Sequence, residues 1–167
     1  MDDRARISPA RLDSARGNLQ QWLTGYTPDI VLIELGTNDV FQCVATNDII
    51  NNLMQIVDTL RNHNNKIKIF LAQIPPLGQQ WALKKLCGDS ITYDARIKTL
   101  NKAIFTLSQK MNSKQSLVIA VDQYTGVNPA TDMYDDIHPN TKGEEEMAKR
   151  WFEKIKNFIP ALPNFAP

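Results

Sequence analysis

The chain has 167 residues, of which 43% are hydrophobic and 22% charged, and this size and composition predict one globular domain over residues 1–167 with a core of its own. The net charge of +1 gives no electrostatic reason to expect binding to nucleic acid or to an anionic membrane. No apolar run approaches the length of a membrane span and the N-terminal residues lack an apolar signal core, so the sequence favours a soluble protein. Its compartment stays undetermined, and a secreted parent protein is compatible with it.

Helical and strand-like segments alternate along the chain. In order, we predict a helix that begins at Ser8 and Pro9 and ends near Gly25, a strand over residues 30–35, a helix from Asn47 or Asp48, a strand over 67–74, a helix over 97–107, a strand over 117–121 and a last helix that ends at Pro160. The run 30–35 is almost continuously apolar, which is typical of a strand buried on both faces of a parallel sheet. Strands separated by helices predict a three-layer α/β/α fold with a parallel, flavodoxin-like sheet.

Two cysteines, Cys43 and Cys87, are too few for a disulfide framework and lack the spacing of metal ligands. The first interpretation is two separate thiols. The alternative is one disulfide between two loops, because both residues follow shortly after strand-ending motifs.

Two short polar motifs carry the functional signal. The first, GTND at residues 36–39, comes directly after the first predicted strand, and the second, DDIHP at residues 135–139, comes directly before the last helix. Ligands of parallel α/β sheets bind beyond the carboxyl ends of the strands. Both motifs fall on that rim, so we expect them to share one site.

In the second motif, His138 is the best candidate for a general base. Asp135 precedes it by three residues, so a tight turn can bring the carboxylate to the imidazole, fix its tautomer and stabilise the imidazolium. The neighbouring Asp136 is interpreted as a turn or cap residue. The other histidine, His63, falls in a polar turn between a helix and a strand, and is predicted to be a solvated loop residue on the opposite rim.

In the first motif, Asn38 has a side-chain amide that can donate a hydrogen bond to a developing oxyanion. The alternative for Asn38 is a turn residue that follows Gly36. The adjacent Asp39 is expected to hydrogen-bond the loop rather than react.

At these positions the sequence resembles the SGNH/GDSL family of serine esterases. Residues 28–39 resemble the third conserved block of that family and residues 135–139 the fifth, while 73–76 (QIPP) and the pattern from Gly143 to Ala148 are similar to its acetylxylan-esterase-like members. The resemblance covers roughly residues 12–158. It implies that Asn38 is the oxyanion donor, that Asp135 and His138 are acid and base, and that Gly36 and Thr37 bind substrate.

The resemblance also implies a reaction: removal of an acyl group, in particular acetyl, from a carbohydrate or small ester, without metal or cofactor. The family pattern begins with a strand ending in Gly-Asp-Ser, which supplies the nucleophile, and a second block supplies an oxyanion glycine. Both normally precede the helix that begins here near Ser8, so we expect the N-terminal strands to be missing and the chain alone to be inactive unless another serine acts.

One Gly-Asp-Ser is present, at residues 88–90, but it follows a loop-like segment and lies between the two motifs, in the reverse of the family order. Two interpretations stay open. Asp89 or Ser90 starts the third helix, or Ser90 is a relocated nucleophile that reaches the same rim.

The missing strand has a structural consequence. It would leave an apolar edge on the strand that ends at Leu35, so we expect a homodimer, a domain swap or a complementing N-terminal segment. The rival function is a non-catalytic binding or assembly module derived from a hydrolase. A flavodoxin-like nucleotide binder ranks lower, because no strand end carries a glycine-rich phosphate loop.

Overall fold

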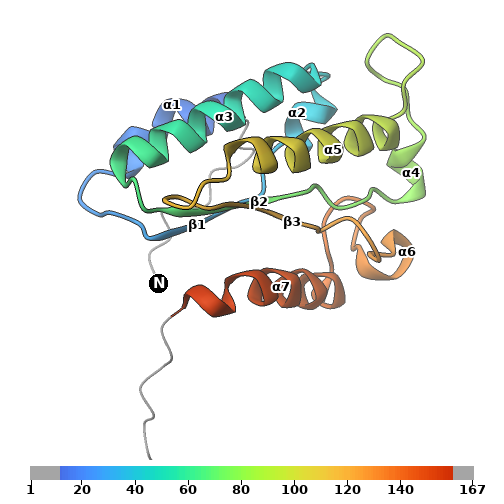
Figure 1. The fold of residues 1–167 in the computed structure, drawn as a ribbon. Coiled ribbons are helices and arrows are strands. Elements are labelled where there is room, and N and C mark those ends of the chain that lie inside the picture. The colour runs from blue at the N-terminus through green and yellow to red at the C-terminus, as the bar shows by residue number, and fades with distance from the viewer. Residues whose placement is uncertain (1–11, 160–167) are drawn as a thin grey trace, which may run out of the picture.

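A parallel sheet of three strands lies between two layers of helices in the computed structural model, which describes residues 12–159 (Figure 1). The strands are β1 (Ile30–Ile33), β2 (Lys68–Ala72) and β3 (Val118–Val121), and they lie in the order β1-β2-β3. Ile30 is paired with Lys68, and Ile69 with Val118, so both ladders are parallel and in the order of the sequence. The predicted α/β class and parallel sheet are confirmed.

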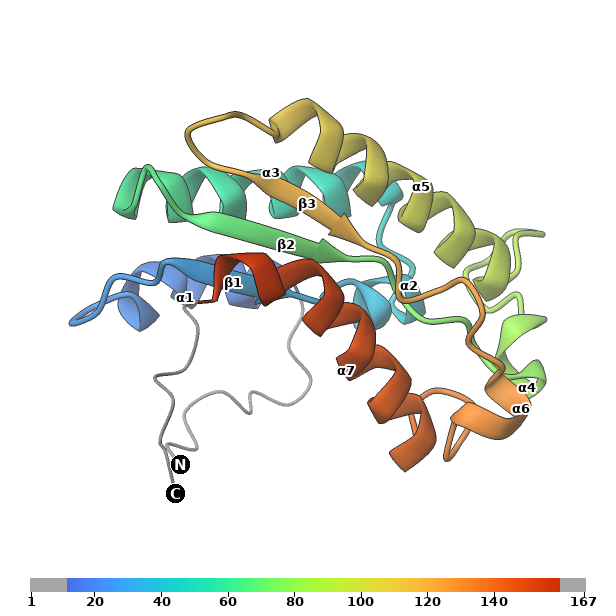
Figure 2. The same cartoon turned by 60° about the horizontal axis from the view of Figure 1, so that its bottom comes forward.

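The helices divide between the two faces of the sheet. They are α1 (Leu12–Trp22), α2 (Thr37–Phe41), α3 (Thr46–His63), α4 (Gln79–Ala82), α5 (Tyr93–Met111), α6 (Pro129–Asp132), α7 (Thr141–Ile155) and a closing 3-10 turn, η1 (Lys156–Phe158). α1, α3 and α5 cover one face, and α7 covers the other (Figures 1 and 2). No helix within residues 12–159 combines the length and the apolar composition that crossing a membrane requires.

The main core lies between the sheet and α3 and α5. These two helices bury apolar residues at helical spacing, namely Ile49, Leu53, Ile56, Val57 and Leu60 from α3 and Ile97, Leu100, Ile104 and Leu107 from α5. The opposite face has a smaller core, in which Phe70, Ala72 and Val121 meet Trp151, Ile155 and Phe158 from the α7 side. The larger core fixes the carboxyl ends of the strands, where the two sequence motifs lie.

The strand β1 differs from the prediction. Burial on both faces was expected, but Leu32 is 44% exposed and only Ile33 of the strand is buried. The reason is position: β1 is the edge of the sheet in the described part of the chain, and of its residues only Ile30 packs with the core on the α7 side. A groove of about 1210 Å³ runs along this edge, lined by α1, β1 and α3, so the expected exposed apolar edge is confirmed.

Two other predictions need correction. The third helix begins after Thr92, whose side-chain oxygen accepts a hydrogen bond from the backbone of Ala95 at 3.2 Å, so neither Asp89 nor Ser90 starts it. Cys43 and Cys87 are joined in a disulfide, so the interpretation as two thiols is wrong. The proposed helix start at Ser8 and Pro9 and the stop at Pro160 lie outside the described residues.

Candidate active site

The DDIHP motif lies in a tight hairpin between α6 and α7, formed by residues 133–139. Met133 and Pro139 form an antiparallel bridge, and the backbone N–H of Tyr134 donates to the carbonyl of His138 at 2.8 Å. Asp136, near the tip, has a φ of 67°, a left-handed conformation that aspartate tolerates better than most residues. The hairpin therefore holds its residues by backbone geometry as well as by side chains.

Within this hairpin, Asp135 and His138 are in direct contact. Asp135 Oδ2 lies 2.7 Å from His138 Nδ1, while Oδ1 accepts the backbone N–H groups of His138 at 2.8 Å and Ile137 at 3.1 Å. The His138 backbone N–H, and then its imidazole, hold the pKa of Asp135 below its usual range. An ionised Asp135 places the proton on Nδ1, which leaves Nε2 as the acceptor on a side chain that is 70% exposed.

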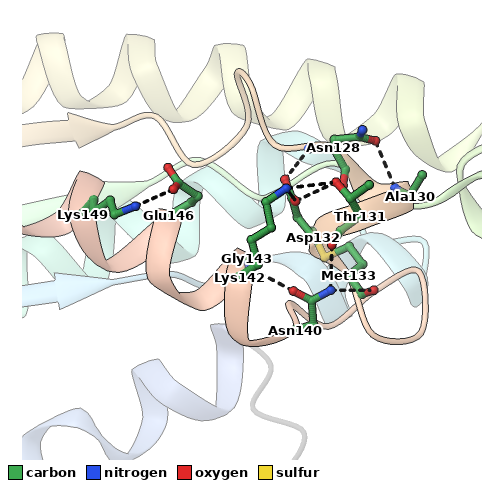
Figure 3. A network of polar contacts seen from close by, with 10 residues as sticks. All are labelled: Asn128, Ala130, Thr131, Asp132, Met133, Asn140, Lys142, Gly143, Glu146 and Lys149. Carbon is green, nitrogen blue, oxygen red and sulfur yellow. Dashed lines mark hydrogen bonds and ion pairs between the residues drawn. The ribbon is translucent and has the colours of Figure 1, made fainter.

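A polar network on the N-terminal side of α7 supports the hairpin (Figure 3). The buried carboxylate of Asp132 pairs with Lys142 Nζ at 2.6 Å, and accepts hydrogen bonds from the Asn128 backbone and the Thr131 hydroxyl, each at 2.8 Å. The Lys142 ammonium, followed by these donors, lowers the pKa of Asp132 to about 2. This carboxylate stays charged and joins α6 to the first turn of α7.

Asn140 closes the same corner of the molecule. Its side-chain oxygen caps α7 by accepting the backbone N–H of Gly143 at 3.1 Å, and its amide donates to the carbonyls of Thr131 at 2.9 Å and Met133 at 3.3 Å. Gly143 allows the close approach, because a Cβ there would lie 2.2 Å from the backbone oxygen of Asp132.

The tip of the hairpin is bonded to α4. The carbonyl of Asp136 accepts the backbone N–H of Gly78 at 2.8 Å, and its carboxylate accepts that of Gln80 at 3.2 Å. A Cβ on Gly78 would lie 2.0 Å from the Asp136 carboxylate, so only glycine fits. The interpretation of Asp136 as a turn or cap residue is confirmed for the turn.

The GTND motif forms the start of α2. Gly36 has a φ of 126° and packs against Leu100, and a Cβ there would lie 3.0 Å from the Leu100 side chain. Thr37 and Asn38 follow in the first turn and are half-buried, and the Asn38 side chain makes no hydrogen bond to any residue from 12 to 159. Asp39 is buried and accepts the backbone N–H of Leu12 at 3.3 Å, in keeping with a structural role in the loop.

The sequence-predicted residues gather only in part. α2, α4 and α6 lie at the same end of the sheet (Figure 1), which brings both motifs to one rim. Ser90 is an exposed residue in the loop between α4 and α5, and no hydrogen bond within residues 12–159 joins it to His138 or Asn38. In Figures 1 and 2 that loop lies on the α5 side, and α6 on the side of α7.

His63 lies where the sequence placed it, at the opposite end of the sheet. It ends α3, and its Nε2 lies 3.0 Å from the Tyr26 carbonyl. It is exposed, and its partners are loop groups, so the structure confirms the interpretation as a loop residue on the far rim.

Sequence reasoning missed two buried polar residues that hold the rim in place. Besides Asp132, Asn101 on α5 bonds both backbone groups of Ile74, accepting its N–H at 2.7 Å and donating to its carbonyl at 2.8 Å. The position of Asn101 in the sequence could have revealed it. Asn101 follows Leu100 on the apolar face of a predicted helix, and a polar side chain buried there needs a hydrogen-bond partner.

Fold and site together define an α/β protein with a carboxylate-oriented histidine at the carboxyl edge of a parallel sheet, an arrangement suited to acyl transfer. The sequence profile of the GDSL-like Lipase/Acylhydrolase family matches residues 5–145, and the chain belongs to this family of SGNH-type hydrolases. The predicted family resemblance is confirmed.

The chain is also similar to individual esterases. The chain is 32% identical over 141 residues to a protein named "Multidomain esterase" from Ruminococcus flavefaciens, covering 84% of this chain and 17% of that protein. An acetyl esterase mutant solved with an acetate ion has a TM-score of 0.75 at 27% identity, covering 88% of this chain and 66% of that one. A carbohydrate esterase of family 3 from Talaromyces cellulolyticus also scores 0.75, at 26% identity, with coverages of 91% and 69%.

Proposed function

We propose that this domain hydrolyses esters by serine chemistry and removes acetyl groups from a carbohydrate or a small ester. The observation that carries the proposal is the 2.7 Å contact between Asp135 and His138 Nδ1, on an imidazole that is 70% exposed. The acetyl and the carbohydrate are supported by the names of its relatives, an acetyl esterase and a carbohydrate esterase.

In the proposed reaction, a serine hydroxyl attacks the ester carbonyl while His138 Nε2 takes its proton. Asp135 stabilises the resulting imidazolium, and the Asn38 amide donates to the oxyanion of the tetrahedral intermediate. The imidazolium then gives the proton to the leaving alcohol, which leaves an acyl-enzyme. Water, deprotonated by His138, cleaves the acyl-enzyme to release the carboxylic acid and restore the serine. Gly36 and Thr37 form the loop that receives the acyl group, and no cofactor takes part.

The source of the serine has two candidates. Ser90 is one, and it requires the loop between α4 and α5 to bring the hydroxyl to His138. The other is a serine on a strand that pairs with β1, supplied by a second copy of the chain or by a complementing segment. This candidate is supported by the groove along β1. It is also supported by the backbone of the strand, whose hydrogen-bonding groups point alternately toward β2 and away from it. The Asp29 carbonyl accepts the backbone N–H of Lys68 in β2, so the backbone N–H and carbonyl of Leu32, three residues later, point away from β2.

The first test is hydrolysis of 4-nitrophenyl acetate by the chain and by Ser90→Ala and His138→Ala. Loss of activity in both variants identifies Ser90 as the nucleophile. Activity that is lost in His138→Ala but kept in Ser90→Ala places the serine elsewhere. Labelling with a serine-directed phosphonate, followed by peptide mass analysis, then names the residue.

A non-catalytic binding module is the second candidate function, and the exposed position of Ser90, without a hydrogen bond to His138, favours it. It predicts no phosphonate labelling and no turnover above the His138→Ala background, although the chain is folded. Turnover that depends on His138 would exclude it.

A further inference from the structure

Tyr134 is the most exposed of the large apolar and aromatic side chains between residues 12 and 159, at 79%. Its backbone holds the hairpin, through the N–H that donates to His138, but its ring adds nothing to the core. Exposing an aromatic ring of this size gives up the favourable free energy of its burial. The fold does not need this ring, so we looked for its role in the binding of a ligand at the hairpin.

The ring stands beside the candidate base. Met133 and Pro139 are bridged as antiparallel partners, so the next pair inward is Tyr134 and His138, which the 2.8 Å hydrogen bond confirms. Directly opposed residues of an antiparallel pair project their side chains from the same face, with Cβ atoms about 5 Å apart. The phenol and the 70% exposed imidazole therefore share one face of the hairpin.

The charges of the hairpin select the kind of ligand. Residues 133–139 include two carboxylates, Asp135 and Asp136, and no lysine or arginine. The nearby Lys142 is already paired with Asp132 at 2.6 Å. An anionic ligand gains nothing here, whereas a neutral ring with hydroxyl groups suits a tyrosine, which offers an apolar face and a polar tip.

We infer that Tyr134 is a substrate-contacting residue that packs against a neutral sugar ring on the alcohol side of the ester. This inference rests on the proposed function and adds to it the residue that recognises the alcohol. An acetyl group seated at His138 then has its sugar carrier on the face of the hairpin that bears the phenol ring.

The test is binding of an unreactive sugar, so that it does not depend on turnover. Xylotriose and cellotriose are titrated against the wild type, Tyr134→Ala and Tyr134→Phe, with saturation-transfer NMR as the readout. Phe105→Ala is the matched control, because Phe105 is 52% exposed on α5, away from the hairpin. Tyr134→Leu is a second variant that keeps an apolar side chain but removes the aromatic ring.

We expect Tyr134→Ala to weaken binding of at least one trisaccharide roughly two- to tenfold, the range of a single aromatic contact. Tyr134→Phe should keep most of the affinity, Tyr134→Leu should lose part of it, and Phe105→Ala should match the wild type. Equal affinity in the wild type and Tyr134→Ala, or binding of neither sugar to the wild type, overturns the inference.

Hydrolysis of 4-nitrophenyl acetate separates this inference from the proposed function. Binding that depends on Tyr134, without hydrolysis, supports the sugar contact and argues against the enzyme. Hydrolysis that depends on His138, without any Tyr134 effect on sugar binding, supports the enzyme and removes Tyr134 from recognition.

Discussion

The hairpin of residues 133–139 and the outer edge of β1 are built in opposite ways. The hairpin is bonded to α4 through Asp136, and its Met133 carbonyl to the start of α7 through Asn140, so the Asp135–His138 pair is fixed by neighbours within the domain. The β1 edge has no strand beside it within residues 12–159, and Leu32 is 44% exposed there. The acid–base half of the proposed machinery is thus preformed, whereas the open edge is where a further segment can be accommodated.

The largest expected effect comes from a substitution that disrupts the preformed Asp135–His138 pair. Asp135→Asn keeps the size of the side chain but replaces the carboxylate that holds the proton on Nδ1, so His138 no longer presents Nε2 as the acceptor. If the chain hydrolyses 4-nitrophenyl acetate, we expect kcat to fall about 10²- to 10⁴-fold. Asp136→Asn is the control, because its main contact to Gly78 is through the backbone, and a change of similar size there would contradict the assignment.

The next effect concerns a charge in the open groove. Burial raises the pKa of Glu34, a lining residue of the β1 groove, from 4.5 to about 7. Because the folded pKa exceeds the unfolded one, the folded state binds more protons between these values, and stability falls as the pH rises from about 4.5 to 7. Above that window the ionised carboxylate costs up to about 3 kcal/mol.

Glu34→Gln removes this charge, so it should be more stable than the wild type at pH 8 and equal to it at pH 4.5, as measured by urea unfolding. Glu145→Gln, at an exposed position of α7, serves as the control for the loss of a surface carboxylate. A difference between Glu34→Gln and the wild type that does not change with pH would show that the carboxylate is not desolvated.

A pair of identical substitutions compares the packing of the two regions. At Gly143, on the hairpin side, a Cβ would lie 2.2 Å from the Asp132 backbone, so Gly143→Ala should lower the free energy of unfolding by about 1–3 kcal/mol. At Gly17, on α1 beside the β1 groove, a Cβ meets nothing within 4 Å, so Gly17→Ala should raise it by about 0.5–1 kcal/mol. The same sign in both variants, measured by urea unfolding, would contradict the difference in packing.

The smallest effect on stability, and the sharpest test of the edge, comes from Leu32→Lys. A charge on an exposed edge strand blocks strand pairing but should change the free energy of unfolding by no more than about 0.5 kcal/mol. If a second copy covers β1, sedimentation should show a dimer for the wild type and a monomer for Leu32→Lys, with Phe105→Lys on α5 remaining a dimer. A monomeric wild type would exclude the second copy and leave the complementing segment as the remaining partner.

Patterns that depend on near neighbours were predictable from the sequence. The spacing of apolar residues, which changes between helical and strand-like segments, predicted the order of the main helices and strands. The three-residue spacing of Asp135 and His138 predicted the contact between them. Features set by distant residues were harder to predict. The apolar run of β1 alone predicted burial on both faces, and the exposure of Leu32 followed only from the expectation that a neighbouring strand is missing. The pairing of Cys43 with Cys87 depends on two loops meeting, and the sequence offered it only as an alternative.

Caps and buried polar residues were the intermediate case. Asp89, Ser90 and Thr92 all suit a helix start, and only the fold shows that Thr92 makes the capping hydrogen bond while Asp89 pairs with Arg96. Asp132 reads in sequence as a surface residue of a polar loop, because its partners Asn128 and Lys142 are common surface residues themselves. The roles of Asn38, Asp135, His138 and Ser90 in a reaction remain predictions.

The disulfide between Cys43 and Cys87, which are 44 positions apart, closes a covalent ring that contains α3, β2 and α4. A protease that cuts one bond inside this ring leaves the two pieces joined, so the nicked chain migrates as one species on a gel until a reductant is added. The ring also includes Gly78 and Gln80, whose backbone N–H groups bond Asp136 in the hairpin. A single cut inside the ring therefore leaves these two residues covalently attached to the rest of the chain, close to the hairpin that carries His138.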